Sequence, residues 1–457
     1  MSRPAESLTP GPGGDWPHTG RVLPWMLAAF LLLIWFVPFD ATSAPFSLPV
    51  DSQLDRVVLA ALALAWVVAA LGARELGPRR VRSPVNVAVL AFLAVATISV
   101  LLNVSTLARL DELDLAIKKL SLACSLAVFF CVAATTIRRA ELRPFITFTI
   151  VLASIAAVGT IIEFRSGTNH FYALADSLIP GFTVAPEPVD PTFGRPSVSG
   201  PTGHGLALTV MFAMALPFVI VRLTQAETRR RLLYAAAAGL ILAGGVATLR
   251  KTAVPAFGLG LLVLTVYRPR EMVRLLPLGL VLVLAIHLLA PGALSGLRYE
   301  LTGGSEFSNQ ARVSDYDAVE PDIAAHPLLG RGYGTYDPQI HQRADTSQRH
   351  RILDNQYLLV LIETGFVGLL VFICLAVTAI IALHRTARSP DPARAEPAIA
   401  IIAGVGAFAV ASTLFDTLAF PQVPYLFFFL LALGVVARLE TEPIRLPRRR
   451  STAGAEA

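Results

Sequence analysis

Residues 354–383 read DNQYLLVLIETGFVGLLVFICLAVTAIIAL, and this stretch decides the fold of the chain. It begins with polar side chains and continues as an apolar run, Gly365–Leu383, that is long enough to cross the hydrocarbon layer of a membrane as a helix. Similar runs recur along the whole sequence. We therefore predict an all-α polytopic membrane protein.

The other apolar runs lie on both sides of this stretch. Hydrophobic residues make up 54% of the 457 residues and charged residues only 15%, which excludes an ordinary soluble protein. We predict about twelve transmembrane helices, at Leu23–Phe39, Val57–Gly72, Val85–Leu102, Leu120–Ile137, Phe145–Ile162, Gly205–Val221, Leu232–Leu249, Thr252–Tyr267, Leu275–Ala290, Gly365–Leu383, Ala398–Leu414 and Val423–Ala437.

The distribution of positive charge predicts the orientation. If the N-terminus is cytoplasmic, the inner segments hold 24 of the 38 Lys and Arg residues, which agrees with the positive-inside rule. Both termini are then expected in the cytoplasm. The net charge of +6 comes from these short inner loops, which contact anionic lipid, so no nucleic-acid partner is implied.

The long polar segments divide the chain into parts. We expect a cytoplasmic tail at 1–22, nine membrane helices in 23–290 with an outer strap at 165–204, and one large extracytoplasmic loop domain at 291–355. Three more helices follow in 356–438, and a basic cytoplasmic tail covers 439–457. Within the large loop, 308–325 has helical spacing and the glycine-rich 329–336 indicates a turn.

Arg250 and Lys251 lie in a very short predicted turn between two apolar spans. They fit an anionic group such as a diphosphate, although snorkelling to lipid headgroups is the alternative. Glu363 lies near the start of the tenth span, where it indicates either a functional site or a structural ion pair. Glu163 and Arg165 close the fifth span, and they are interpreted as an interfacial flank, with a site role as the alternative.

Charged residues of the outer segments extend this site. Arg195 and His204 bracket the end of the strap, and Arg312 lies in the large loop; all three fit one outer anionic pocket, or solvated loop charges. His326 and His350 are candidate bases, or exposed polar surface. Asp354 has two equally supported interpretations: a catalytic base, or the N-cap of the helix that follows it.

Four passages, taken in order, resemble the O-antigen ligase and polymerase family of bacterial membrane glycosyltransferases. The first runs from Arg195 through Gly200-Pro201-Thr202-Gly203-His204, and the second is Thr248-Leu249-Arg250-Lys251. The third runs from Arg312 through His326-Pro327-Leu328-Leu329-Gly330-Arg331-Gly332-Tyr333-Gly334. The fourth is Asp354-Asn355-Gln356-Tyr357-Leu358 with Glu363-Thr364-Gly365. The resemblance covers most of the chain after residue 190.

The resemblance implies a helical fold in the inner (plasma) membrane. It implies transfer of a glycan from a polyprenyl-diphosphate carrier such as undecaprenyl diphosphate to a glycan or lipid acceptor on the outer face, as a ligase or a polymerase. No metal or nucleotide cofactor is implied. The resemblance also implies that the diphosphate is bound by Arg195, Arg250, Lys251 and Arg312. The pocket is then supported by His204, Glu363 and Arg331. Oligomeric state, sugar and linkage do not follow from the sequence.

The sequence does not decide which residue is the catalytic base. Ligases of the family usually place a histidine where the large loop returns to the membrane, and this chain has Asp354 there. Asp354 is the first candidate, His350 and His326 follow, and positioning of the acceptor alone is the third possibility. A glycan or lipid exporter without chemistry is the main rival function, and a scaffold for other assembly enzymes is another.

Overall fold

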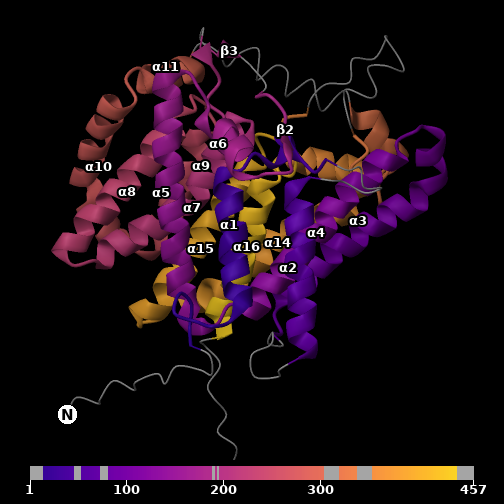
Figure 1. Ribbon diagram of the computed structural model, residues 1–457, viewed down its shortest axis with the longest axis horizontal. Coiled ribbons are helices and arrows are strands. Elements are labelled where there is room, and N and C mark those ends of the chain that lie inside the picture. The colour runs from indigo at the N-terminus through magenta and orange to yellow at the C-terminus, as the bar shows by residue number, and fades with distance from the viewer. Residues whose placement is uncertain are drawn as a thin grey trace, which may run out of the picture.

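The computed structural model describes residues 14–45, 53–72, 81–187, 191–192, 195–302, 319–336 and 353–439. In these residues the protein is a bundle of helices with two very small sheets (Figure 1). The helices are α1 Val22–Phe36, α2 Leu54–Leu71, α3 Pro84–Arg109, α4 Leu113–Thr136, α5 Leu142–Ser166, α6 His170–Leu178, α7 Gly205–Gln225, α8 Thr228–Ala247, α9 Ala253–Tyr267, α10 Pro269–Leu289, α11 Ala293–Thr302, α14 Gln356–Ala387, α15 Pro392–Ala411 and α16 Gln422–Arg438.

The strands are two residues long. β1 (Thr42–Ser43) pairs antiparallel with β2 (Thr183–Val184), and β3 (Pro191–Thr192) pairs antiparallel with β4 (Arg195–Pro196). The predicted outer strap at 165–204 contains β2, β3 and β4 and also the short helix α6. Asn169 starts this helix by accepting a hydrogen bond from the amide of Phe171 at 3.0 Å, as N-cap residues do.

The long helices confirm a multi-pass membrane protein. Nine helices among the described residues are long and apolar enough to cross a membrane. Three shorter apolar helices, α1, α9 and α16, coincide with three further predicted spans. The count of twelve stays a prediction for these three, because each has fewer than 18 residues.

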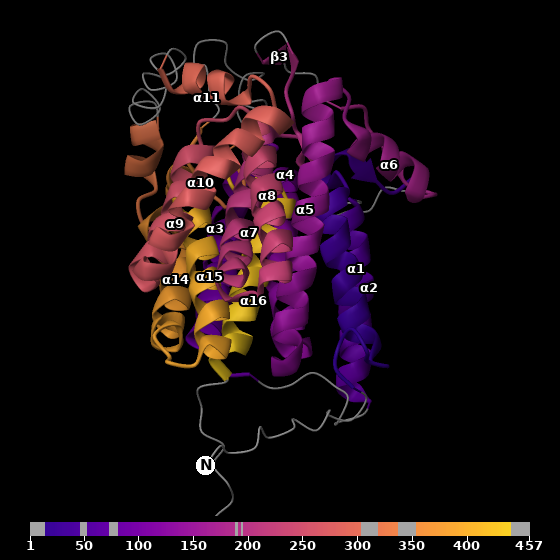
Figure 2. The same ribbon diagram turned by 90° about the vertical axis from the view of Figure 1, so that its left-hand side faces the viewer.

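The helices α7, α15 and α16 form the centre of the bundle. Almost every residue of α7 and α16 is buried, including Phe212, Phe218 and Tyr425. Helix α15 packs against α7, α9, α14 and α16 (Figure 2). In contrast, α10 and the outer face of α14 expose apolar side chains such as Leu280 and Leu370, as expected of a surface that meets lipid.

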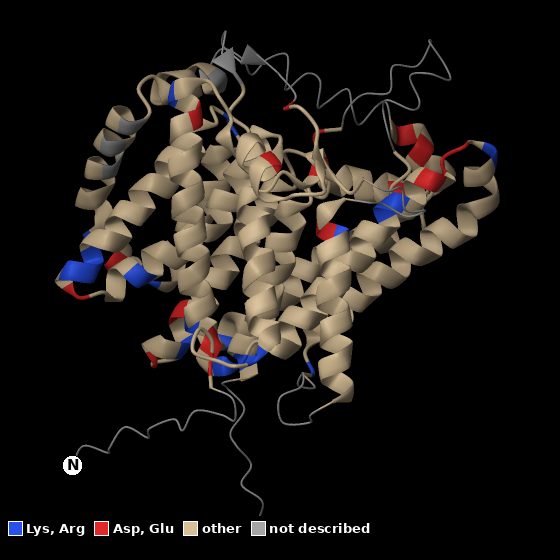
Figure 3. Cartoon of the chain, viewed as in Figure 1, with Lys and Arg blue, Asp and Glu red and all other residues tan. Residues whose placement is uncertain are grey.

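Charge gathers at the two ends of the bundle and is nearly absent between them (Figure 3). The first residues of α1 and the last residues of α16 lie at the same end, the lower one in Figure 1, and many of the described Lys and Arg residues lie there too. The predicted cytoplasmic side corresponds to this lower end. Its orientation in a membrane stays a prediction.

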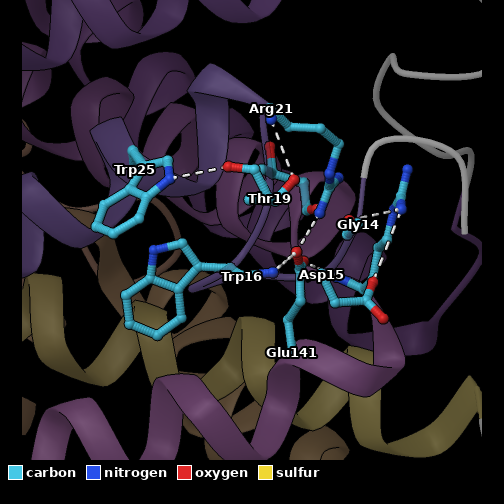
Figure 4. A network of polar contacts seen from close by, with 9 residues as sticks. Gly14, Asp15, Trp16, Thr19, Arg21, Trp25 and Glu141 are labelled. Atoms are coloured by element: carbon cyan, nitrogen blue, oxygen red, sulfur yellow. Dashed lines mark hydrogen bonds and ion pairs between the residues drawn. The ribbon is translucent and has the colours of Figure 1, made fainter. Parts of the chain in front are cut away.

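A buried polar network fastens residues 14–21 to the lower end (Figure 4). Glu141, which is fully buried, accepts hydrogen bonds from the amides of Trp16 and Arg138, both at 2.8 Å, and pairs with the guanidinium of Arg21. The Trp16 ring stacks on Phe145 with 4.5 Å between ring centroids. The segment before α1 is thereby held against the start of α5.

Helix α14 is broken near its upper end. Gly365 has φ 68° and ψ −170°, so the helical path stops there and resumes with a new direction. Residues 327–332 insert at the break: the amide of Phe366 donates to the carbonyl of Pro327 at 2.8 Å, and the amide of Gly332 donates to the carbonyl of Glu363 at 3.1 Å. The predicted turn at 329–336 is confirmed. Residues 319–325 are helical, as the spacing in 308–325 predicts, and the helix continues past Pro321, at which the sequence predicts a kink or an end.

Candidate active site

The upper end of the bundle brings together the strap, the turn between α8 and α9, and the start of α14. Arg250 lies in that turn, and its Nη2 donates to Ser197 Oγ of the strap at 2.7 Å. A Cβ on Gly205 would lie 3.3 Å from Arg250 Nε and 2.7 Å from the carbonyl oxygen of Val198. Only glycine at the first position of α7 therefore allows Arg250 to lie this close to the strap.

The turn itself has an unusual backbone. Leu249 has φ +57°, in the left-handed region that non-glycine residues rarely adopt. Thr248, just before it, is fixed from both sides, because its hydroxyl lies 2.6 Å from that of Thr209 and donates to the carbonyl of Gly245 at 2.8 Å. This geometry directs Arg250 toward the strap. Lys251 follows and is half-buried.

Glu163 holds the strap in place, so its interpretation as an interfacial flank was wrong. Its side chain is buried at 4% exposure and accepts hydrogen bonds from the amides of Ser199 at 2.8 Å and Gly200 at 3.0 Å. Asn169 adds a hydrogen bond to the carbonyl of Gly200 at 2.9 Å. No local signal indicated this role, because Ser199 and Gly200 lie 36 and 37 residues after Glu163.

His204 joins the strap to the connection between α15 and α16. Its Nδ1 accepts a hydrogen bond from the amide of Leu206 at 3.3 Å, which makes it the N-cap of α7. This geometry requires an unprotonated Nδ1. The His204 ring stacks on Phe420 with 5.1 Å between centroids. The role of His204 in lining the pocket stays a prediction, and it would use Nε2 or the ring face.

Residues 412–421, between α15 and α16, link the strap to the start of α14. The amide of Gln356 donates to the carbonyl of Ser412 at 2.9 Å, and Gln356 Oε1 accepts from the amide of Leu418 at 2.7 Å. On the other side, Gln422 Nε2 donates to the carbonyl of Pro201 at 2.9 Å. Sequence reasoning gave this connection no role.

Asp354 is not the N-cap of α14. Asn355 takes that position, and its Oδ1 accepts from the amides of Tyr357 at 3.0 Å and Leu358 at 3.2 Å. The capping alternative for Asp354 was therefore wrong by one residue. Asn and Asp cap helices about equally well, so the two adjacent residues could not be separated from the sequence. Asp354 is half-buried.

Asp416 provides a second carboxylate near Asp354, and sequence reasoning missed it. Asp416 Oδ1 accepts from the amides of Leu418 at 3.2 Å and Ala419 at 3.1 Å. Burial raises the pKa of Asp416, Lys119 of α4 opposes this rise, and the charge of Asp354 adds to it. The upper end therefore holds two carboxylates and a lysine within electrostatic reach of one another.

Of the large-loop residues, Arg331 pairs with a carboxylate at the start of α4, and His326 is exposed to solvent. Arg331 Nη2 donates to both carboxylate oxygens of Glu112, at 3.0 and 3.1 Å, and its Nη1 lies 3.6 Å from Asp322 Oδ2. His326 is exposed. Arg331 therefore holds the glycine-rich turn against the N-terminus of α4, and its predicted support of the pocket acts at most through this turn.

Glu363 is buried, with 8% of its surface exposed. Its Oε1 accepts from the amide of Tyr336 at 3.4 Å, and the amide of Gly334 also bonds its carboxylate. The positive charge of Lys119 also acts on it. Glu363 thus anchors the end of the glycine-rich turn through backbone amides, and its role in the pocket stays a prediction.

The remaining predicted site residues are Arg195, Arg312 and His350. The backbone of Arg195 pairs with Thr192 in β4, two residues before Ser197, so it lies on the same strap as the partner of Arg250. Arg312 and His350 lie outside the described residues. Among the residues that the structure describes, no group of three or more His, Cys, Asp or Glu side chains could hold a metal ion.

A pocket of about 270 Å³ opens beside the strap. Its walls come from the end of α5, from the strap and from the end of α8, and they include Glu163, Arg165, Ser197, Thr248 and Leu249. Ser197 connects this pocket to Arg250. An anionic group bound by Arg250 would therefore have an adjoining cavity with both polar and apolar walls.

Residues 236–373 match the family model described as O-antigen ligase. This part of the chain is similar to that family. The matched segment runs from α8 through the first part of α14, so it includes Arg250, the glycine-rich turn and the break at Gly365. It confirms the resemblance predicted from the sequence and supports a role in glycan assembly. No curated protein matches the chain.

Proposed function

We propose that this O-antigen ligase-like protein transfers a glycan from a polyprenyl-diphosphate carrier to an acceptor hydroxyl at the upper end of the bundle. The observation that carries the proposal is the contact of Arg250 with Ser197. It brings a guanidinium of the matched segment against the strap, beside a pocket, at the end where Asp354 and Asp416 also lie.

The proposed reaction is a single displacement. The acceptor oxygen forms a bond to the anomeric carbon of the glycan, and the bond between that carbon and the diphosphate oxygen breaks. The acceptor proton passes to a base, and the carrier leaves as its diphosphate. Charge develops on the diphosphate in the transition state, and a fixed guanidinium such as Arg250 stabilises that charge.

The roles proposed for the described residues follow from their positions, and those of Arg312 and His350 rest on the sequence alone. Arg250 is the principal diphosphate ligand, and Lys251 and Arg195 neighbour it in the turn and the strap. Arg312 belongs to the same proposed set. Asp354 is the first candidate for the base, because it lies just before α14 at the upper end and its charge acts on the buried carboxyl of Asp416. His350 and His326 remain the alternatives.

We further propose that the upper end faces the outside of the cell's inner membrane, that both termini are cytoplasmic and that the donor is an undecaprenyl-type carrier. The reaction needs no metal. Both a ligase, with a lipid acceptor, and a polymerase, with a glycan acceptor, use this chemistry, so the position of Arg250 supports them equally.

The test is release of the carrier. Purified protein in lipid nanodiscs is incubated with a polyprenyl-diphosphate oligosaccharide and candidate acceptors, beside an Arg250→Ala variant and an Arg109→Ala control. Arg109 is an exposed arginine at the end of α3. We expect release of free carrier diphosphate by the native protein and the control, and a loss of about 100-fold in Arg250→Ala.

The opposite result favours an exporter. If no donor releases its carrier while labelled glycolipid still crosses the bilayer in proteoliposomes, the arginines hold a cargo and the transferase proposal fails. Equal release by Arg250→Ala and the native protein would remove Arg250 from the donor site.

A further inference from the structure

A second cavity lies at the lower end of the bundle, far from the candidate active site. Its volume is about 510 Å³, and it lies between the start of α3 and the ends of α14 and α16. Arg385, Arg438, Pro84, Ile381 and Ala382 are among the residues that line it. Along α14, Arg385 follows Asn355 by 30 residues, a helical length of about 45 Å.

The polar part of this cavity is positively charged. Arg385 comes from the last turn of α14 and Arg438 from the last turn of α16. Pro84, the first residue of α3, places the N-terminal end of a 26-residue helix at the same cavity, where the helix dipole favours an anion. None of the described residues that line the cavity is an Asp or a Glu.

The other part of the cavity is apolar and continues along the protein surface. Ile381 and Ala382 precede Arg385 by four and three residues, so they lie on the same face of α14, one turn closer to the middle of the bundle. Ile381 is 68% exposed. A row of exposed apolar side chains extends this face at the same helical spacing: Val377, Ile373, Leu370 and Phe366.

This arrangement fits a molecule with an anionic head and an apolar tail. We propose that the cavity binds an anionic phospholipid, with its phosphate between Arg385 and Arg438 and an acyl chain along the exposed row on α14. A free phosphate would use the arginines but would leave the apolar wall unexplained. Two arginines can together contact several phosphate oxygens and neutralise a net negative charge. A zwitterionic headgroup already carries its own cation, so it gains less from the two arginines.

The proposal concerns a different surface from the glycan-transfer site and does not depend on that activity. A bound lipid would join α3, α14 and α16, three helices that otherwise meet at this end with a gap between them. We therefore expect it to stabilise the lower end of the bundle and the lower part of α14.

The experiment uses the full chain, purified in detergent and freed of lipid. Phosphatidylglycerol, phosphatidylcholine and inorganic phosphate are titrated separately, and binding is followed by native mass spectrometry and by the thermal unfolding temperature. Three variants are compared with the native protein: Arg385→Ala/Arg438→Ala, Ile381→Trp, and the control Arg229→Ala/Arg274→Ala. The control removes two exposed arginines of α8 and α10 at the same end.

We expect phosphatidylglycerol to bind the native protein and the control at least tenfold more tightly than Arg385→Ala/Arg438→Ala. We also expect it to raise the unfolding temperature of the native protein, whereas phosphatidylcholine and phosphate do not. Ile381→Trp fills the apolar part with both arginines intact, so it should weaken lipid binding even if the double variant fails to fold. Equal lipid binding by all variants, or an equal response to inorganic phosphate, would overturn the proposal.

Discussion

Gly330 and Gly365 interlock at the break of α14. Both have positive φ angles, 69° and 68°. A Cβ on Gly330 would overlap the backbone of Glu363 and Thr364, and a Cβ on Gly365 would overlap the backbone of Leu328 and Leu329. Each glycine therefore lets the backbone of the other segment approach, and four hydrogen bonds close the junction: Arg331 N to Ile362 O, Gly332 N to Glu363 O, Phe366 N to Pro327 O and Val367 N to Leu328 O.

This junction predicts a strong effect of adding one methyl group. Gly365→Ala combines a strained backbone with a main-chain overlap, so it should lower the free energy of unfolding by about 3 kcal/mol or more. The matched control is Gly258→Ala, an exposed position in α9 where an added Cβ meets nothing within 4 Å. Thermal unfolding in nanodiscs measures both. Equal unfolding temperatures for the two variants would contradict the interlock.

The same junction marks the limit of what the sequence reveals. The apolar runs predicted the helices well, because a span of this length has few other structures available in a membrane. The run Gly330–Gly334 was predicted as a turn because glycine favours turns. Its partner, Gly365, was counted inside an apolar span, since nothing local to it shows that another segment docks there.

The candidate site shows the same division. Arg250 was singled out because a charge between two apolar spans is unusual, and it does contact the strap. Glu163 was misread, because its role depends on the amide of Ser199, which is distant in sequence. Asp416 was missed, because only the folded loop directs the amide of Leu418 toward it.

The hydrogen bond between Arg250 and Ser197 predicts a graded series in glycan transfer. Ser197→Ala keeps the guanidinium but removes the group that fixes its position, so activity should fall roughly tenfold. Arg250→Lys keeps the charge and loses the planar fork, and it should lie between Ser197→Ala and Arg250→Ala. Release of carrier diphosphate is the measurement. A Ser197→Ala variant with native activity would show that the contact does not position Arg250 for the reaction.

Removal of the Glu141 carboxylate is expected to destabilise the lower end of the bundle strongly. The side chains of Glu141 and Arg21 are 0% and 7% exposed, so Glu141→Ala leaves a buried guanidinium without its carboxylate. Such a change lowers the free energy of unfolding by about 3 kcal/mol. The control is Glu227→Ala, an exposed carboxylate just before α8 at the same end. Unfolding temperatures measured in parallel should separate the two variants, and glycan transfer at permissive temperature should stay unchanged in both.

Asp416 predicts a pH dependence of stability. Burial raises its pKa, so the folded protein resists ionisation of this carboxyl more than the unfolded chain does. The folded state then binds more protons than the unfolded state between the two pKa values. Stability is highest below the ordinary Asp value of 3.8, falls as the pH rises through the raised pKa, and is constant above it.

Asp416→Asn removes this ionisation and keeps an oxygen that accepts the amides of Leu418 and Ala419. The unfolding temperature of the variant should therefore approach that of the native protein at about pH 4 and exceed it at pH 7. Asp391→Asn, at an exposed side chain before α15, controls for the loss of one negative charge. Parallel temperature curves for Asp416→Asn and the native protein across this range would contradict the burial of Asp416, whereas lost glycan transfer with raised stability would indicate that its charge serves the reaction.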